Sequence, residues 1–318
     1  MHQTFTITEI RTENYRTKTF IFDRSLPGAQ PGQYVMAWLP DVGEKPFSIA
    51  GNAPLALMVV AVGPFSEALH RLRVGERVWV RGPLGQGFVL HGAHHLLVGG
   101  GYGVAPLLFL ARTALAAGHS VEVCIGARTA EDVLLAEAFM STDSTDFNGL
   151  REEKKSDTVA LTTRTSTDST DFNGLREEKK SDTVVLTTRS STDSTDFNGL
   201  REKKSVSSVQ SVDKLLITTE DGTLGEQGLV TRAVEAAIAA RRPDCVYACG
   251  PAPMLTALAR LCQAHSLPHQ FSWEAHLRCG LGICGSCELD ATTRQAANIP
   301  TGWLVCKDGP VRIMIHDS

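Results

Sequence analysis

The chain has 318 residues, of which 42% are hydrophobic, and this length and composition are those of a globular protein with room for two domains of ordinary size. Its formal net charge of -4 excludes a broad electrostatic attraction to nucleic acid or to an anionic membrane. No apolar run approaches the ~20 residues of a membrane span, and the N-terminal "MHQTFTITEIRTENY" alternates like a strand rather than showing the layout of a signal peptide. We therefore expect a cytoplasmic protein.

Residues 1–92 contain short apolar runs separated by Gly and Pro, which predict a small antiparallel β-barrel. The predicted strands are "FTITEIRT", "KTFIFDR", "GQYVMAWLP", "FSIAG", "LALMVVAVG" and "ERVWVRGPLG". One helix is expected among them, "SEALHRLRVG", with Ser66 as its N-cap and Gly75 after its end.

Residues 93–272 alternate between strands and helices, which predicts an open parallel sheet covered by helices. The expected order is strand "HHLLVGG", helix "PLLFLARTALAAG", strand "SVEVCIGAR", helix "AEDVLLAEAF", strand "KLLITTE", helix "GLVTRAVEAAIAARR", strand "DCVYACG" and helix "APMLTALARLCQAH". The fold class is therefore multidomain β plus α/β, and residues 273–318 form a third, C-terminal subdomain.

Residues 141–213 interrupt this alternation. The unit "STDSTDFNGLREEKKSDTVALTTRT" begins at Ser141, recurs at Ser166 and starts a third time at Ser191, so its period is 25 residues. Each unit has too few apolar residues to offset the entropy of ordering it. We expect a disordered or loosely structured insertion in a helix-to-strand loop; the alternative is a small folded appendage or partner site.

Two glycine-rich turns follow predicted strands. "VGGGYGVAP" contains Gly99, Gly100, Gly101, Gly103 and Pro106, and "YACGPAPM" contains Cys249, Gly250 and Pro251. Glycine lets the backbone approach a ligand, a helix N-terminus offers free N–H groups to a pyrophosphate, and ligands of open α/β sheets bind at the carboxyl ends of the strands. Together the turns favour a dinucleotide, although each is also explained by tight packing. The sequence leaves open whether Cys249 contacts the nicotinamide, and whether Asp221 contacts a ribose or belongs to a plain turn.

The barrel region contains weaker signals for a second ligand. In "EKPFSIAG", Lys45 can meet a phosphate, Phe47 can stack on a flat ring and the Ser48 hydroxyl can bond a ring heteroatom; the alternative is an ordinary strand with a solvated lysine. "RGPLGQGF" adds a glycine loop that can receive a second phosphate through Gly82, Gly85 and Gly87.

Eight cysteines divide into two groups. Four of them, Cys124, Cys245, Cys249 and Cys262, lie in isolated or apolar surroundings and are expected to be buried free thiols. The other four have the spacing C-x4-C-x2-C…C of a plant-type [2Fe–2S] site, with zinc and disulfides as alternatives. The expected cluster ligands are Cys279, Cys284, Cys287 and Cys306. No pair of histidines has metal-ligand spacing.

The order of these motifs, "KPFS", "GPLGQGF", "GGGYGVAP", "CGPAPM" and a C-terminal four-cysteine cluster followed by "KDGPV", resembles the ferredoxin–NADP⁺ reductase superfamily. Within it, the chain is similar to the electron-transfer subunits of NAD-dependent (type B) dihydroorotate dehydrogenases. The resemblance implies that FAD binds at the KPFS motif and at the barrel helix, and that NAD(H) binds at the two glycine turns. The FAD residues so implied are Lys45, Pro46, Phe47, Ser48, Gly63 and Ser66. Lys45 stands where the family usually has arginine, and Phe65 where a small residue is common.

The resemblance also implies a function. A nicotinamide exchanges two electrons at once and a [2Fe–2S] cluster passes one, so a flavin between them connects the two. We expect an FAD- and [2Fe–2S]-containing oxidoreductase subunit that links NAD⁺ to an FMN-containing catalytic dihydroorotate dehydrogenase subunit in a heterotetramer of pyrimidine biosynthesis. No general acid or base is expected in this chain. The rivals are a flavin subunit of another cytosolic complex, such as a hydrogenase or a sulfite or sulfide reductase, and a zinc-stabilised binding module.

Overall fold

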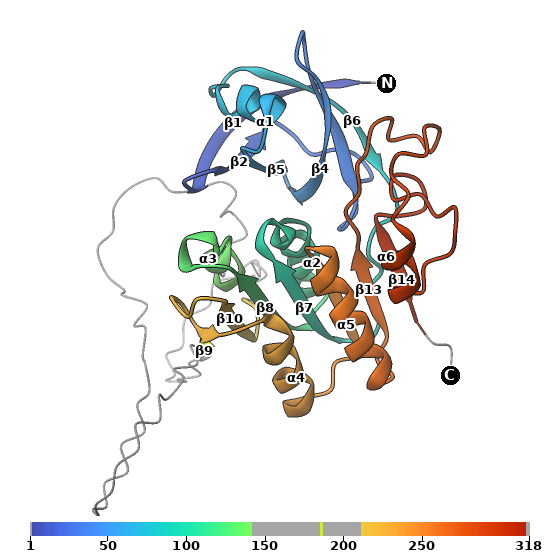
Figure 1. Cartoon of the computed structure of the whole chain (residues 1–318). Helices are drawn as coiled ribbons and strands as arrows, with labels where there is room; N and C mark the ends of the chain where they lie inside the picture. Colours follow the sequence, from blue (N-terminus) through green and yellow to red (C-terminus); the bar gives the residue numbers. More distant parts are fainter. Residues whose placement is uncertain (1, 142–184, 187–210, 316–318) are drawn as a thin grey trace, which may run out of the picture.

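The computed structural model describes residues 2–141, 185–186 and 211–315. A six-stranded antiparallel barrel stands above an open sheet that is flanked by helices (Figure 1). The barrel closes in the order β1-β2-β5-β4-β3-β6. Its strands are β1 (Gln3–Asn14), β2 (Thr17–Phe22), β3 (Tyr34–Leu39), β4 (Gly43–Asn52), β5 (Leu55–Val60) and β6 (Arg77–Leu84). Alternate side chains point inward and fill the barrel with aromatic and branched residues, among them Phe5, Phe20 and Val80.

The sheet runs in the order β11-β10-β8-β7-β12-β13-β14. Its strands are β7 (His94–Gly100), β8 (Ser120–Ala127), β10 (Lys214–Thr219), β11 (Glu226–Gln227), β12 (Cys245–Cys249), β13 (His269–Ser272) and β14 (Val311–Met314), and the short β9 (Val185–Leu186) pairs antiparallel with β10. All neighbours from β11 to β13 are parallel, and β14 is antiparallel to β13. The chain order reverses between β7 and β12, which is the switch point where open α/β sheets bind ligands.

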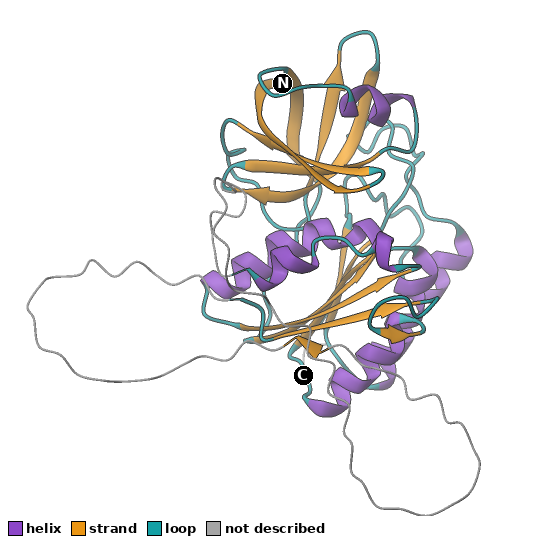
Figure 2. Cartoon of the chain, turned by 90° about the vertical axis from the view of Figure 1, so that its left-hand side faces the viewer, coloured by secondary structure: helices purple, strands orange, loops and turns teal. Residues whose placement is uncertain are grey.

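Helices cover both faces of the sheet (Figure 2). Helix α2 (Val104–Ala116), with α3 (Ala136–Met140), packs on the face that carries Leu97 and Val123. Helices α4 (Val230–Ala240) and α5 (Ala252–Ala264) pack on the other face, which carries Leu96 and Val98. The barrel contributes to the hydrophobic core under α2, because the buried barrel residues Ala50 and Met58 pack in the same cluster as the buried side chains of α2. Among the described residues, no helix is long and apolar enough to cross a membrane.

Two details of the predicted helices are wrong. The barrel helix α1 spans Pro64–His70 with Gly63 as its N-cap, so Ser66 lies inside the helix, and the helix ends well before Gly75. Proline at the first position starts the helix earlier than Ser66 because its fixed φ suits that place. The stretch predicted as one helix at 130–139 is a 3-10 turn (Ala130–Asp132) followed by α3, because Leu135 has a φ of 58° and breaks the helix between them.

The C-terminal segment leaves the sheet after β13 and returns to it as β14. Between them lie a glycine-rich loop, α6 (Ala291–Ala296) and a bridge between Glu288 and Leu304. Trp303 and Val305 of this segment join a core cluster that also contains Tyr34 of the barrel. The segment is therefore packed against both the barrel and the sheet, on the right in Figure 1.

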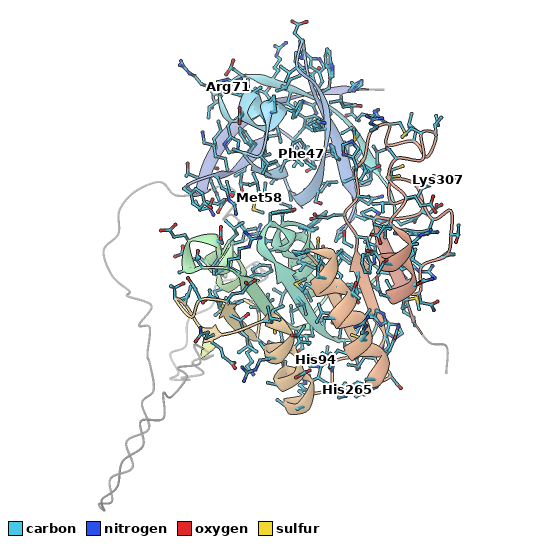
Figure 3. The ribbon with its side chains drawn as sticks, viewed as in Figure 1. Phe47, Met58, Arg71, His94, His265 and Lys307 are labelled. Carbon is cyan, nitrogen blue, oxygen red and sulfur yellow. The ribbon has the colours of Figure 1, made fainter. Side chains whose placement is uncertain are left out.

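The insertion lies at the predicted place, between α3 and β10, but most of it falls outside the described residues, so the expectation about its structure is not addressed by them. Its two ends are close, since the Val212 N–H donates to the Phe139 carbonyl at 3.3 Å. The expectation that the four cysteines outside the C-terminal cluster are buried free thiols is confirmed. Two of the histidines lie in the sheet: His95 is fully buried against His119, and His94 lies at the end of the sheet away from the barrel (Figure 3).

Candidate functional site

The four C-terminal cysteines lie together in two pairs. The Sγ atoms of Cys287 and Cys306 are 3.2 Å apart, and both residues are buried. Cys279 and Cys284 form the second pair, whose thiols interact with each other; Cys284 is exposed and Cys279 half-buried. The site therefore has one pair facing the interior and one facing the solvent.

Backbone N–H groups of the loop between the pairs point at the sulfurs. The Gly282 N–H donates to Cys306 Sγ at 3.2 Å, and the Leu281 N–H donates to Cys279 Sγ at 3.4 Å. These turns require Gly280, Gly282 and Gly285 at φ values of 64°, 75° and 71°, which favour glycine. Hydrogen bonds from backbone N–H groups, that of Leu281 first, lower the pKa of Cys279 to about 6, so this thiol is mainly a thiolate at neutral pH.

The donor set fits a [2Fe–2S] cluster. Each of its two irons takes two thiolates and shares two sulfides, so a two-iron cluster needs two separate pairs of cysteines. Among the described residues, no group of three or more His, Cys, Asp or Glu side chains is gathered closely enough to hold one metal ion. Two pairs of thiols with N–H donors directed at their sulfurs fit a two-iron cluster. Cys279, Cys284, Cys287 and Cys306 would hold it.

The barrel contacts this site directly. The Tyr34 hydroxyl, from β3, is buried and donates to the Cys306 carbonyl at 2.9 Å. Burial raises the pKa of Tyr34, so it remains a neutral donor. The solvent side of the loop is apolar by contrast, since Ile283 is 80% exposed and Leu281 56% exposed.

The two glycine turns meet at the switch point of the sheet. A Cβ atom on Gly103 would lie 2.2 Å from the Cys249 carbonyl oxygen, and one on Gly250 would lie 3.1 Å from the Gly100 Cα. Glycine at these positions thus allows the turns after β7 and β12 to touch. Gly101 has a φ of 54° and open space around it, whereas Gly99 packs against Val104.

A cavity of about 520 Å³ lies over these turns, between the barrel and the carboxyl ends of β7, β8, β10 and β12. Gly100, Gly101 and Pro251 line it among the predicted residues, while Cys249 and Pro106 are buried behind it. The further charged and polar lining residues are Asn14, Arg16, Thr17, Tyr102, Arg128, Asp132, Glu220 and Thr231. This is the place, size and mixed lining of a nucleotide site in an open α/β sheet.

Asp221 does not line this cavity. Its carboxylate accepts hydrogen bonds from the N–H (3.0 Å) and hydroxyl (2.7 Å) of Thr223, which favours the plain turn over a ribose contact. The neighbouring Glu220 lines the cavity instead.

Tyr102 lines the cavity and is hydrogen-bonded to Glu274, which lies outside the lining. The Tyr102 hydroxyl donates to Glu274 Oε2 at 3.0 Å, which ties the β7 turn to the start of the cysteine segment. Partial desolvation at this contact raises the pKa of Glu274, and with the Glu274 charge it raises the pKa of Tyr102 to about 12, although Tyr102 and Glu274 are both exposed to solvent. Burial, with a smaller contribution from Glu274, also raises the pKa of Cys249 to about 12, so this residue is a neutral thiol.

The predicted flavin residues lie along β4 and at the start of α1. Lys45 is exposed, Pro46 and Ser48 are half-buried, and the half-buried Phe47 ring lies 6.0 Å from that of Phe65; Figure 3 shows Phe47 in the barrel. Gly63 has open space around its Cα. This opening and the half-buried Phe47 ring fit a flat ring and a phosphate.

Two other groups of predicted residues have local roles in the structure. The Ser66 hydroxyl accepts the Val62 and Gly63 N–H groups at 2.9 and 3.1 Å. Three glycines of the "RGPLGQGF" loop pack tightly: a Cβ would lie 3.0 Å from the Val35 side chain at Gly82, 2.4 Å from the Gly309 carbonyl at Gly85 and 2.6 Å from the Pro31 carbonyl at Gly87. Their contact with a phosphate remains a prediction.

Comparison with known proteins decides the family. Residues 274–312 match a family model described as the iron-sulfur cluster binding domain of dihydroorotate dehydrogenase B. A relative from Thermococcus kodakarensis, named probable dihydroorotate dehydrogenase B (NAD(+)), electron transfer subunit, is 31% identical over 98% of this chain and 96% of its own length. The chain belongs to this family of electron transfer subunits. A relative of the same name from Methanocaldococcus jannaschii is 27% identical over 96% of this chain and 87% of its own.

Solved structures confirm the fold of this electron transfer subunit family member. An NADH-dependent reduced ferredoxin-NADP oxidoreductase structure superposes with a TM-score of 0.65 at 21% identity, covering 97% of this chain and 87% of that one. The ferredoxin reductase in carbazole 1,9a-dioxygenase gives a TM-score of 0.54 at 16% identity, covering 85% and 68%. The predicted combination of barrel, parallel sheet and C-terminal iron-sulfur segment is therefore confirmed.

Sequence reasoning missed several residues of the site. Tyr34, Arg16 and Glu274 reach it from elements distant in sequence, and no local motif marks them. Arg128 and Glu220 had a local signal, because each is the last residue of a predicted strand whose carboxyl end faces the cavity.

Proposed function

We propose that the chain passes electrons between a catalytic dihydroorotate dehydrogenase subunit and NAD⁺. In this scheme a [2Fe–2S] cluster binds at the four cysteines, FAD binds at the barrel and NAD(H) binds in the cavity at the switch point. The observation that carries the proposal is the position of the paired cysteines, which are packed against the barrel on one side and exposed on the other.

FAD would supply the conversion between the two-electron chemistry of nicotinamide and the one-electron chemistry of the cluster. Lys45, Pro46, Phe47, Ser48, Gly63 and Ser66 would hold it, with Gly82, Gly85 and Gly87 beside it. The two glycine turns would hold the NAD(H) pyrophosphate: Gly99, Gly100, Gly101, Gly103, Pro106, Cys249, Gly250 and Pro251. Since the Cys249 thiol is buried and neutral, its role there is to pack rather than to exchange a proton.

The partner would approach the exposed side of the cluster. Ile283 and Leu281 offer an apolar surface beside Cys284, and such a surface favours a protein partner over solvent. We propose an FMN-containing catalytic subunit as that partner, in a heterotetramer within the cytoplasm. The relatives are named as electron transfer subunits of dihydroorotate dehydrogenase B, which supports this partner. No specific observation favours a hydrogenase or a sulfite or sulfide reductase complex.

We also propose a division of the chain by function: residues 1–92 for FAD, 93–272 for NAD(H) with the insertion at 141–213, and 273–318 for the cluster. The barrel strands end at Leu84 and the sheet begins at His94, which supports the first boundary.

Anaerobic purification with assay of iron, sulfide and flavin tests this function. We expect two irons and two sulfides per FAD, bleaching of the flavin absorbance by NADH, and recovery of a catalytic dihydroorotate dehydrogenase subunit from the native host. A colourless protein that contains zinc, or one recovered with a nickel-binding or sulfite-reducing subunit, would overturn the proposal.

A further inference from the structure

An ion pair in the barrel wall lies next to the outer cysteine pair. Arg81, in β6, donates to both carboxylate oxygens of Glu44, in β4: Nε to Oε1 at 3.2 Å and Nη2 to Oε2 at 2.9 Å. The side chains are only 17% and 22% exposed. The bidentate geometry fixes the guanidinium plane, which a single contact would not do.

The same guanidinium donates a hydrogen bond to the backbone of one of the four cysteines. Arg81 Nη2 also donates to the backbone carbonyl of Cys279 at 3.0 Å, so a cation fixed in the barrel contacts a residue of the outer pair. Glu44 binds Arg81 on the barrel side and also contacts Nε2 of His2 at 2.9 Å. Within the described part of the chain, Arg81 Nη1 is buried and has no hydrogen-bond partner. A buried guanidinium N–H without an acceptor is costly, and sulfide and thiolate sulfurs of a bound cluster are acceptors.

We infer that Arg81 and Glu44 form a positioning pair that holds Cys279 and sets the reduction potential of the cluster. This inference rests on the proposed [2Fe–2S] site. Reduction adds one negative charge to the cluster, which a nearby guanidinium stabilises and a nearby carboxylate destabilises. Because Arg81 contacts the cysteine and Glu44 lies behind it, the pair as a whole favours the reduced cluster.

The two partners should therefore shift the potential in opposite directions. Arg81→Met removes the cation and leaves the Glu44 carboxylate, so we expect reduction to become about tenfold less favourable, which for one electron is about 59 mV. Glu44→Gln leaves the cation unpaired and should raise the potential by a smaller amount. The reduction potential of the double variant should lie between those of the two single variants. Arg81→Lys keeps the positive charge, so its potential should stay close to that of the wild type.

Redox titration of the cluster followed by electron paramagnetic resonance measures this effect without using activity. Arg24→Met is the matched control, because Arg24 is another barrel arginine in an ion pair, with Asp23, and should leave the potential unchanged. The wild-type spectrum first establishes whether a [2Fe–2S] cluster is present, and its absence would count against the proposed function. A cluster whose potential moves in the same direction in both single variants, or in neither, would overturn this inference. If Arg81→Met fails to take up a cluster, the other two variants still test the inference. The reduction potential should rise in Glu44→Gln and stay close to the wild-type value in Arg81→Lys.

Discussion

The Tyr34 hydroxyl of barrel strand β3 donates a 2.9 Å hydrogen bond to the carbonyl of Cys306, which is a long way off in sequence. The bond joins the barrel to the buried cysteine pair, so the flavin side and the cluster side of the proposed electron path share a rigid contact. Figure 3 shows Lys307, the next residue, on the side of the molecule where the cysteine segment meets the barrel.

Loss of this bond should loosen the cluster. Tyr34→Phe leaves a buried carbonyl without its donor, and we expect the free energy of unfolding to fall by about 1–3 kcal/mol. Urea unfolding followed at the cluster absorbance and by circular dichroism checks this, with cluster release moving to lower urea than the loss of secondary structure. The matched control is Tyr247→Phe, since the Tyr247 hydroxyl also bonds a backbone carbonyl, that of Val89, in the sheet. Equal effects of both variants on cluster release would contradict the expectation.

The contact between the glycine turns predicts a graded effect on nucleotide binding. Gly103→Ala places a Cβ 2.2 Å from the Cys249 carbonyl oxygen, so the turns must separate, and we expect the KM for NADH to rise at least about tenfold. Gly101→Ala meets no atom within 4 Å and is strained only by its φ of 54°, which costs about 1 kcal/mol. NADH-dependent ferricyanide reduction measures both, and a larger effect at Gly101 than at Gly103 would refute this account of the turns.

Glu274 makes stability depend on pH in a defined direction. Burial raises its pKa above the ordinary value of 4.5, against the opposing hydrogen bond from Tyr102. Between 4.5 and the raised value the folded state binds more protons than the unfolded state, so this group's contribution to stability is present at low pH and is lost as the pH rises. Glu274→Gln should remove this loss, so the variant should be the more stable protein at neutral pH, and the difference should shrink as the pH falls towards 4.5; because Glu274 is also exposed to solvent, the gain should be small. Denaturation at a series of pH values tests it; a constant difference between the two proteins would show that Glu274 does not titrate in this way.

The apolar tip of the cysteine loop predicts where the partner binds. Ile283→Glu puts a charge on a side chain that is 80% exposed, so the fold should tolerate it, while association with the catalytic subunit should weaken at least about tenfold. Val74→Glu, at a site that is 60% exposed in the barrel, is the control and should leave association unchanged. Analytical ultracentrifugation of the mixed subunits distinguishes them, and equal binding by both variants would place the partner elsewhere.

Removal of residues 142–210 should leave the fold and NADH-dependent dye reduction intact. Because Val212 N–H bonds the Phe139 carbonyl, a short Gly/Ser linker can join Ser141 to Ser211. Circular dichroism and ferricyanide reduction test the deletion. Loss of activity with the secondary structure preserved would give the insertion a functional role.

Local patterns predicted the elements well where burial alone decides them. The strand at 94–100 was predicted to the residue, because its apolar side chains are buried on both faces of the sheet. The helix at 130–139 was not, since its apolar periodicity does not reveal that Leu135 adopts a left-handed conformation. The short strand β14 could not be predicted either, because its extended conformation depends on its pairing with β13.

Some residues of the candidate site could be predicted from local motifs and others could not. The four cysteines and the two glycine turns can be picked out from the sequence because each motif lies in one or two short stretches with a recognisable spacing. Tyr34, Arg81 and Glu274 cannot, because each acts through a contact between segments far apart in the chain, which composition and periodicity do not encode.

The pairing of Ser272 with Val311 means that the whole cysteine segment begins and ends at adjacent positions of two neighbouring strands. The sheet itself therefore holds the two ends of the segment next to each other. A [2Fe–2S] cluster bound at the four cysteines would then lie in a loop whose base is already closed by two paired strands.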